Sequence, residues 1–348
     1  MFLNTELFGH QRGASNKGYK KIKYGTMVLS TQNLHLGNAN VNQRFEHGMV
    51  SPAYKTYDIT GCYVDLIAQW IKSDAAKRFF YNATTVGASV CRRNVEWDTL
   101  YEQSLYLPCR DEQEKVAKFL GLLSNRINKQ QQFVSALKKY KRGVMQRIFR
   151  NMSAVSPSGF ETVQLSAIFK KVSRRNNKSE IKNVITNSAE YGLIPQRDFF
   201  DKDIAVDGNT SNYYVIEQGD FVYNPRKSNT APYGPFNRYE RKERGIISPL
   251  YTCLVLQADI EPSYLAWYFK SDAWYRYIYD NGSQGVRHDR VSMTDDLLMG
   301  IPVIIPSKEA QLKIAKLLDC LESRFQTELS QYESLKSIRV ALLQQLFI

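Results

Sequence analysis

Cysteine and histidine are scarce in this chain of 348 residues. The cysteines are odd in number and scattered without CxxC spacing, at Cys62, Cys91, Cys109, Cys253 and Cys320. That distribution argues against a disulfide framework and a zinc site, and it predicts reduced thiols in a cytoplasmic protein. The four histidines lie far apart with no cysteine or carboxylate at ligand spacing, so we expect no metal site.

Long apolar runs are also missing. The mean hydropathy is −0.42, and no run approaches the length needed to cross a bilayer, so we expect no membrane association. Met1 onward shows no charged segment followed by an apolar one, which predicts a protein without an export signal. There is no GxxxxGK[ST] phosphate-binding loop, so the chain does not encode ATP-driven translocation.

Positive charge, by contrast, is abundant. The 47 lysines and arginines exceed the 34 acidic residues and give a formal net charge of +13. A surface with this excess attracts polyanions, and nucleic acid is the commonest polyanion inside cells. The charge therefore favours a nucleic-acid partner, although many basic proteins bind none.

A 37-residue segment occurs twice. Residues 113–149 return as residues 311–347 at a constant offset of 198, without a gap. The residues that recur unchanged are Gln113, Lys115, Ala117, Lys118, Leu120, Leu123, Arg126, Leu137, Lys138, Gln146 and Phe149. Such a repeat predicts two copies of one structural unit.

The repeated segment carries a coiled-coil seam. In the first copy the seam runs Val116, Leu120, Leu123, Ile127, Gln130, Val134, Leu137, Lys141, Val144, Ile148. Steps of four and three residues give the period of 3.5 at which long helices pack along their length. The polar interruptions match between copies, Gln130 with Glu328 and Lys141 with Arg339, which favours pairing of the two helices. The alternative is that each helix packs separately on its own globular neighbour.

The repeat extends upstream of the helix. Residues 71–81 match 269–279 at the same offset, and Gly25 matches Gly219 after small slips that we interpret as loop insertions. Short β-rich runs separated by Gly, Pro and Asn predict an α+β unit, with a short strand before Pro108 and another before Pro306. The opening of the second copy, residues 163–187, has no counterpart in the first, which predicts a first unit shortened by roughly thirty residues.

The order of these blocks resembles the specificity subunit (HsdS) of type I restriction–modification systems, and the resemblance covers nearly the whole chain. The family's helix-start pattern stands here as Leu107-Pro108, then Glu112-Gln113, Lys115, Ala117 and Leu120. The second copy has Ala310 in place of the glutamate. Further landmarks are residues 219–222, 245–251 and 285–287.

The resemblance implies an α+β protein in which an antiparallel pair of long coiled-coil helices separates two pseudo-symmetric target recognition domains. The boundaries we expect are 1–108 for a shortened first recognition domain, 109–150 for the first helix and 151–162 for a linker. The second recognition domain is expected at 163–306 and the second helix at 307–348.

The resemblance also implies a non-catalytic subunit that reads a bipartite target in double-stranded DNA. Its expected partners are two methyltransferase (HsdM) subunits and nuclease-translocase (HsdR) subunits. We expect no cofactor in this chain, because S-adenosylmethionine, ATP and Mg would belong to those partners.

The candidate DNA-binding residues are basic and amide side chains, since arginine can grip guanine, amides can read adenine, and cations neutralise phosphates. In the first unit they are Lys20, Lys21, Lys23, Gln32, Asn33, Arg44, Arg92 and Arg93. In the second unit they are Arg226, Lys227, Ser228, Asn229, Arg238, Arg241, Arg244, Gln284, Arg287 and Arg290. For any single residue, a position on a solvated charged surface explains the residue type about as well as contact with DNA does.

Two other functions stay open. One is a truncated or cassette-derived specificity protein that reads a single half-site. The other is a stand-alone DNA-modifying enzyme, for which Asn224-Pro225-Arg226 only faintly resembles the Asn-Pro-Pro-aromatic loop of amino-methyltransferases. The second proline and the aromatic residue are missing, and no glycine-rich adenosylmethionine loop follows an early strand.

Overall fold

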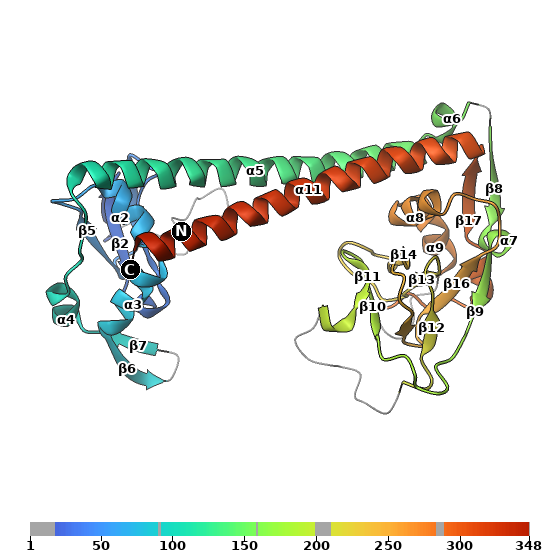
Figure 1. The fold of residues 1–348 in the computed structure, drawn as a ribbon, viewed down its shortest axis with the longest axis horizontal. Coiled ribbons are helices and arrows are strands. Elements are labelled where there is room, and N and C mark those ends of the chain that lie inside the picture. Colours follow the sequence, from blue (N-terminus) through green and yellow to red (C-terminus); the bar gives the residue numbers. More distant parts are fainter. Residues whose placement is uncertain (1–17, 90–91, 158, 199–209, 283–288, 348) are drawn as a thin grey trace. The chain divides into compact units, whose positions relative to one another are not determined.

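The structure is a computed structural model that describes residues 18–89, 92–157, 159–198, 210–282 and 289–347 (Figure 1). The chain divides into two compact units. Unit 1 comprises residues 1–135 and 327–348, and unit 2 comprises residues 136–326. Each unit therefore contains a globular part and segments of two long helices, α5 (Arg110–Arg150) and α11 (Lys308–Leu346).

The globular part of unit 1 is built around a three-stranded antiparallel sheet of order β3-β2-β5. Its strands are β2 (Thr26–Ser30), β3 (Ala39–Val41) and β5 (Tyr54–Asp58), and a second antiparallel pair joins β1 (Lys20–Lys23) to β4 (His47–Val50). The helices are η1 (Leu34–Leu36), α2 (Val64–Trp70), α3 (Asp74–Asn82) and α4 (Trp97–Glu102), with a hairpin of β6 (Thr84–Ser89) and β7 (Arg92–Val95) before α4. Leu29, Ile67 and Phe80 lie in the core beneath.

Unit 2 repeats this plan and adds strands to it. The sheet order is β14-β13-β16-β9, from β14 (Phe236–Arg238), β13 (Phe221–Tyr223), β16 (Thr252–Leu256) and β9 (Phe169–Val172). The pairs are β12 (Tyr214–Ile216) with β15 (Gly245–Ile247), β10 (Ile185–Ser188) with β11 (Gly192–Pro195), and β17 (Pro302–Pro306) with β8 (Phe160–Gln164). The remaining helices are α6 (Met152–Val155), α7 (Leu165–Ile168), η2 (Gln196–Asp198), α8 (Pro262–Lys270), α9 (Tyr275–Asn281) and α10 (Asp295–Met299).

The two sheets confirm the predicted α+β class and the duplication. Strand β5 corresponds to β16, and the order β3-β2-β5 corresponds to β14-β13-β16. Gly25 and Gly219 occupy the turns that separate β1 from β2 and β12 from β13. Both have positive φ angles, +86° and +96°, which glycine adopts without the steric cost that a Cβ brings.

One predicted strand is wrong. The strand before Pro306 is β17, but the equivalent residues 104–108 of unit 1 are in no strand. The physical reason is that β17 forms by pairing with β8, and no counterpart of β8 lies among the described residues of unit 1. The unmatched opening of the second copy is where unit 2 has β8, α7 and β9.

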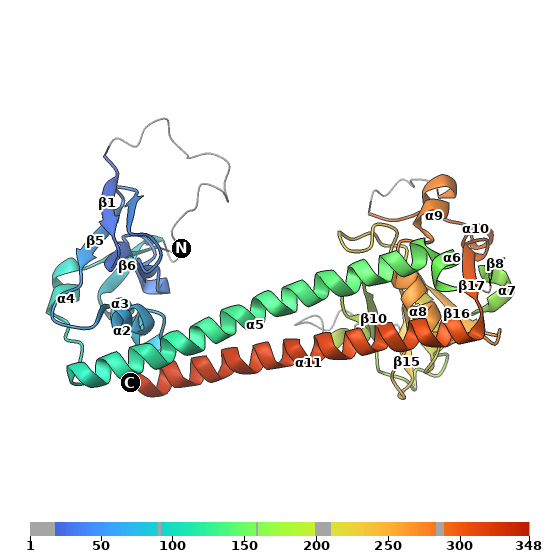
Figure 2. The ribbon, with the colours of Figure 1, turned by 90° about the horizontal axis from the view of Figure 1, so that it is seen from above.

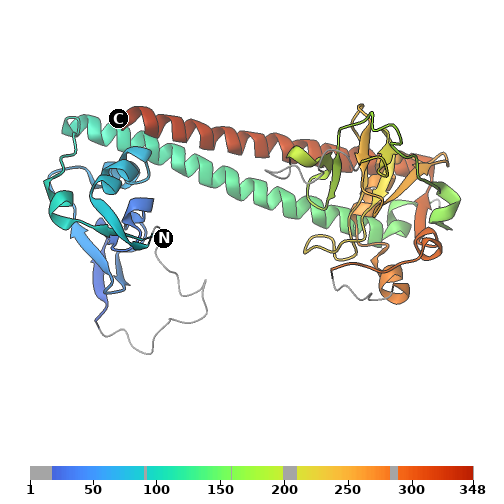
Figure 3. The same ribbon diagram turned by 90° about the horizontal axis from the view of Figure 1, so that it is seen from below.

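The two long helices pair, as the matched seams predict. In unit 1 the Gln130 side chain donates to the Glu328 carboxylate and to its backbone carbonyl, at 2.8 and 3.0 Å. Gln130 and Glu328 are equivalent positions of the repeat, so in unit 1 the polar interruptions contact each other. Arg339 donates to Ser124 in the same unit, and Lys141 to Glu322 in unit 2. Within each unit, the segments of the two helices run antiparallel and side by side (Figures 1, 2 and 3).

Each globular part is completed by the end of the helix from the other repeat. In unit 2, Phe149 near the end of α5 packs edge-on against Tyr268, with ring centroids 5.5 Å apart. In unit 1, the equivalent Phe347 packs on the cluster that contains Leu29 and Phe80. The C-terminal ends of the two helices are therefore exchanged between the repeats.

A buried glutamine fastens the start of each long helix to its own globular part. In unit 1, Gln113 accepts from the Tyr63 backbone N–H at 2.8 Å and donates to the Pro108 carbonyl at 2.9 Å. In unit 2, Gln311 makes the same two bonds, to Glu261 N–H and Pro306 O, both at 2.9 Å. The equivalence of these contacts explains why the glutamine recurs in both copies.

We expect Gln311→Ala to lower the free energy of unfolding of unit 2 by about 2–3 kcal/mol, because two buried backbone groups lose their partner. Hydrogen exchange followed by mass spectrometry resolves the effect by unit. Gln113→Ala should act equally on unit 1, and Gln131→Ala, on the exposed side of α5, is the control. Equal, small losses in all three variants would contradict the role we give to the glutamines.

Candidate nucleic-acid interface

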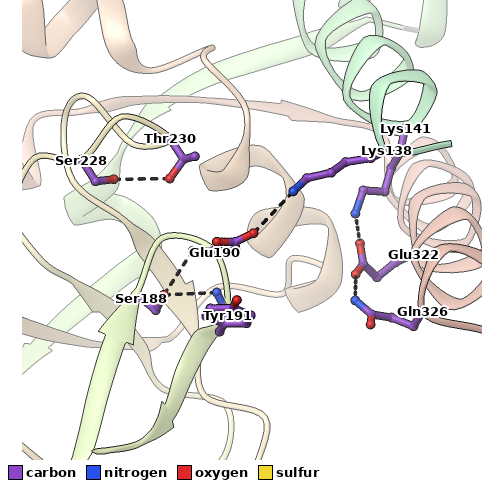
Figure 4. A network of polar contacts seen from close by, with 9 residues as sticks. All are labelled: Lys138, Lys141, Ser188, Glu190, Tyr191, Ser228, Thr230, Glu322 and Gln326. Carbon is purple, nitrogen blue, oxygen red and sulfur yellow. Dashed lines mark hydrogen bonds and ion pairs between the residues drawn. The ribbon is translucent and has the colours of Figure 1, made fainter. Parts of the chain in front are cut away.

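A basic loop follows β13 in unit 2. Arg226 is 69% exposed in its side chain, and Lys227 and Asn229 follow it in the same loop. The Ser228 hydroxyl accepts from the Ala231 backbone N–H at 3.1 Å, so it shapes the turn. Figure 4 shows Ser228 beside Thr230, with their oxygens 3.4 Å apart.

Buried asparagines hold this loop in place. Asn187 donates to the Val222 carbonyl at 2.9 Å and accepts from Asn237 at 2.7 Å. Asn224 donates to the Asn187 carbonyl at 3.3 Å and accepts from the Arg226 backbone N–H at 2.9 Å. Because these amides are bonded within the fold, the loop starts from a fixed position.

The neighbouring turn requires a glycine at position 234. Gly234 has a φ of +85°, and a Cβ there would meet the Asn224 carbonyl oxygen at 2.0 Å. Any other residue would push the turn away from the asparagines. Asn187, Asn237 and Gly234 were not predicted from sequence. The partners of the two asparagines lie 35 and 50 residues away along the chain, and the close approach of Gly234 to Asn224 depends on the folded turn.

A second segment lies against the Arg226 loop. Arg226 and Arg290 pair as an isolated antiparallel bridge, and the Lys227 N–H donates to the Asp289 carbonyl at 2.8 Å. The Asp289 carboxylate lies 3.7 Å from Arg226 and 4.0 Å from Arg290. We call Arg226, Lys227, Asp289 and Arg290 the Arg226–Arg290 cluster. The structure therefore brings together residues that the sequence separates by more than sixty positions.

Tyr251 lies within electrostatic reach of this cluster. Burial raises the pKa of its hydroxyl, while the positive charges of Arg226 and Arg290 act in the opposite direction. A cavity of about 260 Å³ adjoins the cluster and is lined by Pro225, Leu250 and Val291 among others. Leu250 is 61% exposed, so the cluster combines cations with an apolar surface.

The arginines of residues 238–244 lie elsewhere. In the β13–β14 pair, Tyr223 opposes Phe236 and Phe221 opposes Arg238, so Arg238 and Arg226 are at opposite ends of the strands. Each arginine of this loop faces a carboxylate: Arg238 with Glu240 at 3.5 Å, Arg241 with Asp198 at 3.6 Å, and Arg244 with Glu217 at 3.0 Å. These arginines form a second basic region rather than an extension of the cluster.

Carboxylate neighbours do not prevent nucleic-acid binding. Exposed ion pairs are worth about 0–1 kcal/mol, so a phosphate can replace the carboxylate at little cost. The pairs hold the guanidinium groups in defined positions before any ligand arrives. Gln284 and Arg287, two further candidates, lie outside the described residues.

The candidates of unit 1 also fall at two ends of a strand. Lys20 donates to the Tyr54 carbonyl at 2.7 Å, near the Ser30 end of β2, where exposed Gln32 and half-buried Asn33 follow. Lys23 pairs with Asp58 at 3.1 Å, at the Thr26 end. Lys21 and Arg44 are exposed, and the Arg44 guanidinium lies 5.2 Å from the Phe45 ring centre.

Arg93 has a structural role within its hairpin. Its guanidinium donates to the Thr84 hydroxyl at 2.8 Å and the Thr84 carbonyl at 2.6 Å, and it lies over the Tyr81 ring at 4.2 Å. Arg92 lies in β7, at the position equivalent to Arg290. The Arg93 guanidinium therefore makes its contacts within its own hairpin.

The described part of the chain has no helix long and apolar enough to cross a membrane. Nor do its described residues contain a group of three or more His, Cys, Asp or Glu side chains that could hold a metal ion. The candidate interface itself offers cations, amides and a small apolar surface.

Comparison with known proteins gives a match in structure but none in sequence. No protein-family model matches the chain, and no curated protein matches it. The HsdS subunit of Thermoanaerobacter tengcongensis superposes with a TM-score of 0.50 and 16% identity, over 96% of this chain and 83% of that one. The type I restriction–modification S subunit of M. genitalium gives 0.55 and 14%, over 97% and 87%.

A third solved chain comes from work on complex assembly and conformational transition of the type I R-M system. It superposes with a TM-score of 0.56 and 16% identity, over 96% of this chain and 84% of that one. Identities this low show the fold, and they confirm at that level the resemblance found in the sequence. The chain has the fold of the specificity subunits of type I restriction–modification systems.

Proposed function

We propose that this chain is the DNA-reading specificity subunit of a type I restriction–modification complex. The observation that carries the proposal is the duplicated α+β unit on two paired long helices, which matches solved HsdS chains over nearly its whole length. The net charge of +13 and the basic loops of both units support a polyanionic partner.

Each unit reads one short DNA element in this proposal, so the target is bipartite. In unit 2 the Arg226–Arg290 cluster supplies guanidinium groups for guanine edges or phosphates. In unit 1 the corresponding groups are Lys21, Gln32, Asn33 and Arg44. The expected domain boundaries and the roles of individual residues in base reading are part of the proposal.

The chain itself is non-catalytic in this proposal, and methyl transfer and DNA cleavage belong to HsdM and HsdR partners. The long helices offer a surface for those partners. Phe119 and Tyr140 are three heptads apart on α5 and are 52% and 61% exposed, and the equivalent Leu317 and Ile338 of α11 are 48% and 51% exposed. Exposed apolar residues at heptad spacing suit helices of a partner subunit.

The test is methylome mapping in cells that carry the partner methyltransferase, with and without this gene. A bipartite methylated motif that disappears with the gene supports the proposal. If only one specific element is found, the chain reads a single half-site. Unit 1 lacks described counterparts of β8 and β9, and this observation favours that second function. Methyl transfer by the purified chain alone would instead identify a DNA-modifying enzyme.

The same assay tests whether the helices set the spacing between the two elements. Inserting seven matched residues into both α5 and α11 adds about 10 Å to each helix, or about three base pairs of DNA. We expect a methylated motif with a spacer longer by about three base pairs. Seven residues inserted at the exposed Gly61 turn are the control and should leave the spacer unchanged. An unchanged motif after the helix insertions contradicts the spacing role.

A further inference from the structure

In unit 2, strand β17 is paired along its full length. Its residues Pro302–Pro306 oppose Gln164–Phe160 of β8 in antiparallel register (Figure 1). Beyond the strand, the Leu165 N–H donates to the Ile301 carbonyl at 2.8 Å. The chain that follows β8 then buries Leu165 and Ile168 in the core. Strand β8 therefore pairs with β17 and is followed directly by α7, whose apolar side chains are buried in the core.

In unit 1, the equivalent residues 104–108 keep the side-chain pattern of a strand. Leu105 and Leu107 are half-buried and pack on the core, whereas Ser104 and Pro108 are exposed. Tyr106, the counterpart of Ile304, is 94% exposed. The alternation matches β17, in which Val303 and Ile305 face the core. The segment has the pattern of a strand that is buried on one face.

This segment lacks a ladder partner among the described residues. It is in none of the described strand pairings, and no backbone–backbone hydrogen bond between described residues involves positions 103–108. The Gln103 side-chain Nε2 is buried without a hydrogen-bond partner in the described structure. Its equivalent position, Ile301, is the one that meets Leu165 in unit 2. An unpaired side-chain donor therefore lies, among the described residues, at the position equivalent to the end of the β8 pairing.

The pairing of β8 with β17 in unit 2 indicates which backbone groups of residues 103–108 would bond to an added strand in unit 1. Since Leu165 bonds to Ile301, and hydrogen-bonded pairs alternate along an antiparallel ladder, Val303 and Ile305 exchange bonds with Val163 and Glu161. The equivalents of Val303 and Ile305 are Leu105 and Leu107. By this equivalence, the N–H and C=O groups of Leu105 and Leu107 are the ones that an added strand would bond.

We propose that residues 103–108 of unit 1 are a strand-acceptor edge that binds an extended segment of a second polypeptide. The segment has the sequence character of β8: an extended stretch with a β-branched residue facing the core, followed by one apolar helical turn. Unpaired strand edges bind added strands through main-chain bonds, and side-chain pockets supply the specificity. The repeat supplies the reason for this occupant, because β8 and α7 fill the same position in unit 2.

The test uses the intact chain and a fluorescent peptide of residues 159–172, without DNA. We expect saturable binding by fluorescence anisotropy, with hydrogen-exchange protection at Leu105 and Leu107. N-methylation of the peptide at Val163 removes a ladder N–H and should weaken binding at least about tenfold. N-methylation at Thr162, whose N–H points away from the ladder, is the matched control and should leave binding unchanged.

Several outcomes would overturn the proposal. These are absence of saturable binding, equal effects of the two N-methylations, or exchange protection at Val303 and Ile305 in place of Leu105 and Leu107. A concentration-dependent dimer of the chain that protects Leu105 and Leu107 would assign the edge to a second copy and overturn the separate polypeptide. None of these outcomes involves DNA, so they leave the proposed DNA-reading function untouched.

Discussion

Charge reversal of both arginines in the Arg226–Arg290 cluster should lower the affinity of the assembled complex for target DNA about 100-fold. Each guanidinium that grips a base or phosphate contributes about 1–3 kcal/mol, and reversal also leaves two carboxylates beside Asp289, facing the duplex. The measurement is fluorescence anisotropy with duplexes that carry the complete motif or a single element. The loss should appear with the element read by unit 2 and not with the other.

Arg276→Glu is the matched control for this double variant. Arg276 lies in the same unit, is 82% exposed and pairs with Asp280, but it is outside the cluster. The dependence of affinity on salt adds a second readout, because each lost phosphate contact reduces the slope by about one. A loss of affinity in the control as large as in the double variant would mean that only overall charge matters, and the cluster would lose its role.

The second large effect concerns the ion pair inside the helix pair. Glu322→Ser should lower the free energy of unfolding of unit 2 by about 2–4 kcal/mol. The reason is that Lys141 and Lys270 lie close together there, over the Phe325 and Trp267 rings, and Glu322 is the carboxylate bonded to Lys141 (Figure 4). Without it, the half-buried Lys141 ammonium loses its bonded carboxylate and is left near a second cation, the exposed Lys270. Urea unfolding followed by unit-resolved hydrogen exchange measures the loss.

The repeat supplies the converse experiment. In unit 1 the equivalent of Glu322 is Ser124, to which Arg339 donates at 3.2 Å. Burial, followed by the charge of Arg339, lowers the pKa of Lys72, the equivalent of Lys270. Ser124→Glu should therefore stabilise unit 1 by about 1–2 kcal/mol, since an ion pair with Arg339 replaces the bond from Arg339 to a neutral hydroxyl. Ser124→Gln, which adds the size without the charge, is the control; equal gains from both would rule out the electrostatic explanation.

The pH dependence of Glu322 gives a further check on the same pair. Burial alone would raise the pKa of this carboxyl, but bonds from Lys141 and Gln326 and the charges of Lys141 and Lys270 lower it overall. The folded-state pKa is then below the unfolded one, so the stabilisation is complete above the ordinary pKa and is lost as the pH falls through the lowered value. The difference in stability between wild type and Glu322→Gln should shrink accordingly at acid pH.

The features of the fold that the sequence predicted best are those that occur in both copies of the repeat. The offset of 198 and the period of 3.5 together predicted the two long helices and their pairing through Gln130 and Glu328, because both depend on side chains at regular positions. The strand before Pro108 was wrong for a physical reason. Alternation in residues 104–108 encodes a buried face, but a strand also needs a ladder partner, which sequence periodicity does not report.

The candidate interface could be predicted only in composition. Basic and amide residues were recognised by type, but their grouping depends on which strand ends meet, and that is set by the register of β13 with β14. Hence the sequence predicted basic residues at Arg226 and at Arg238 but not that they lie at opposite ends of a strand pair. Asp289, which bridges two arginines, carried no signal, since a lone acidic residue in a basic stretch has no distinctive pattern.

The exchange of helix ends has a consequence for biosynthesis. Unit 1 includes residues 327–348, so its last pieces leave the ribosome only after the about 190 residues of unit 2. At about 5–20 residues per second, the nascent first domain waits about 10–40 seconds with the site for Phe347 uncovered. Unit 2 receives its exchanged helix end early, from α5. Translation speed and chaperone supply should therefore affect the correctly folded fraction of unit 1 more than that of unit 2.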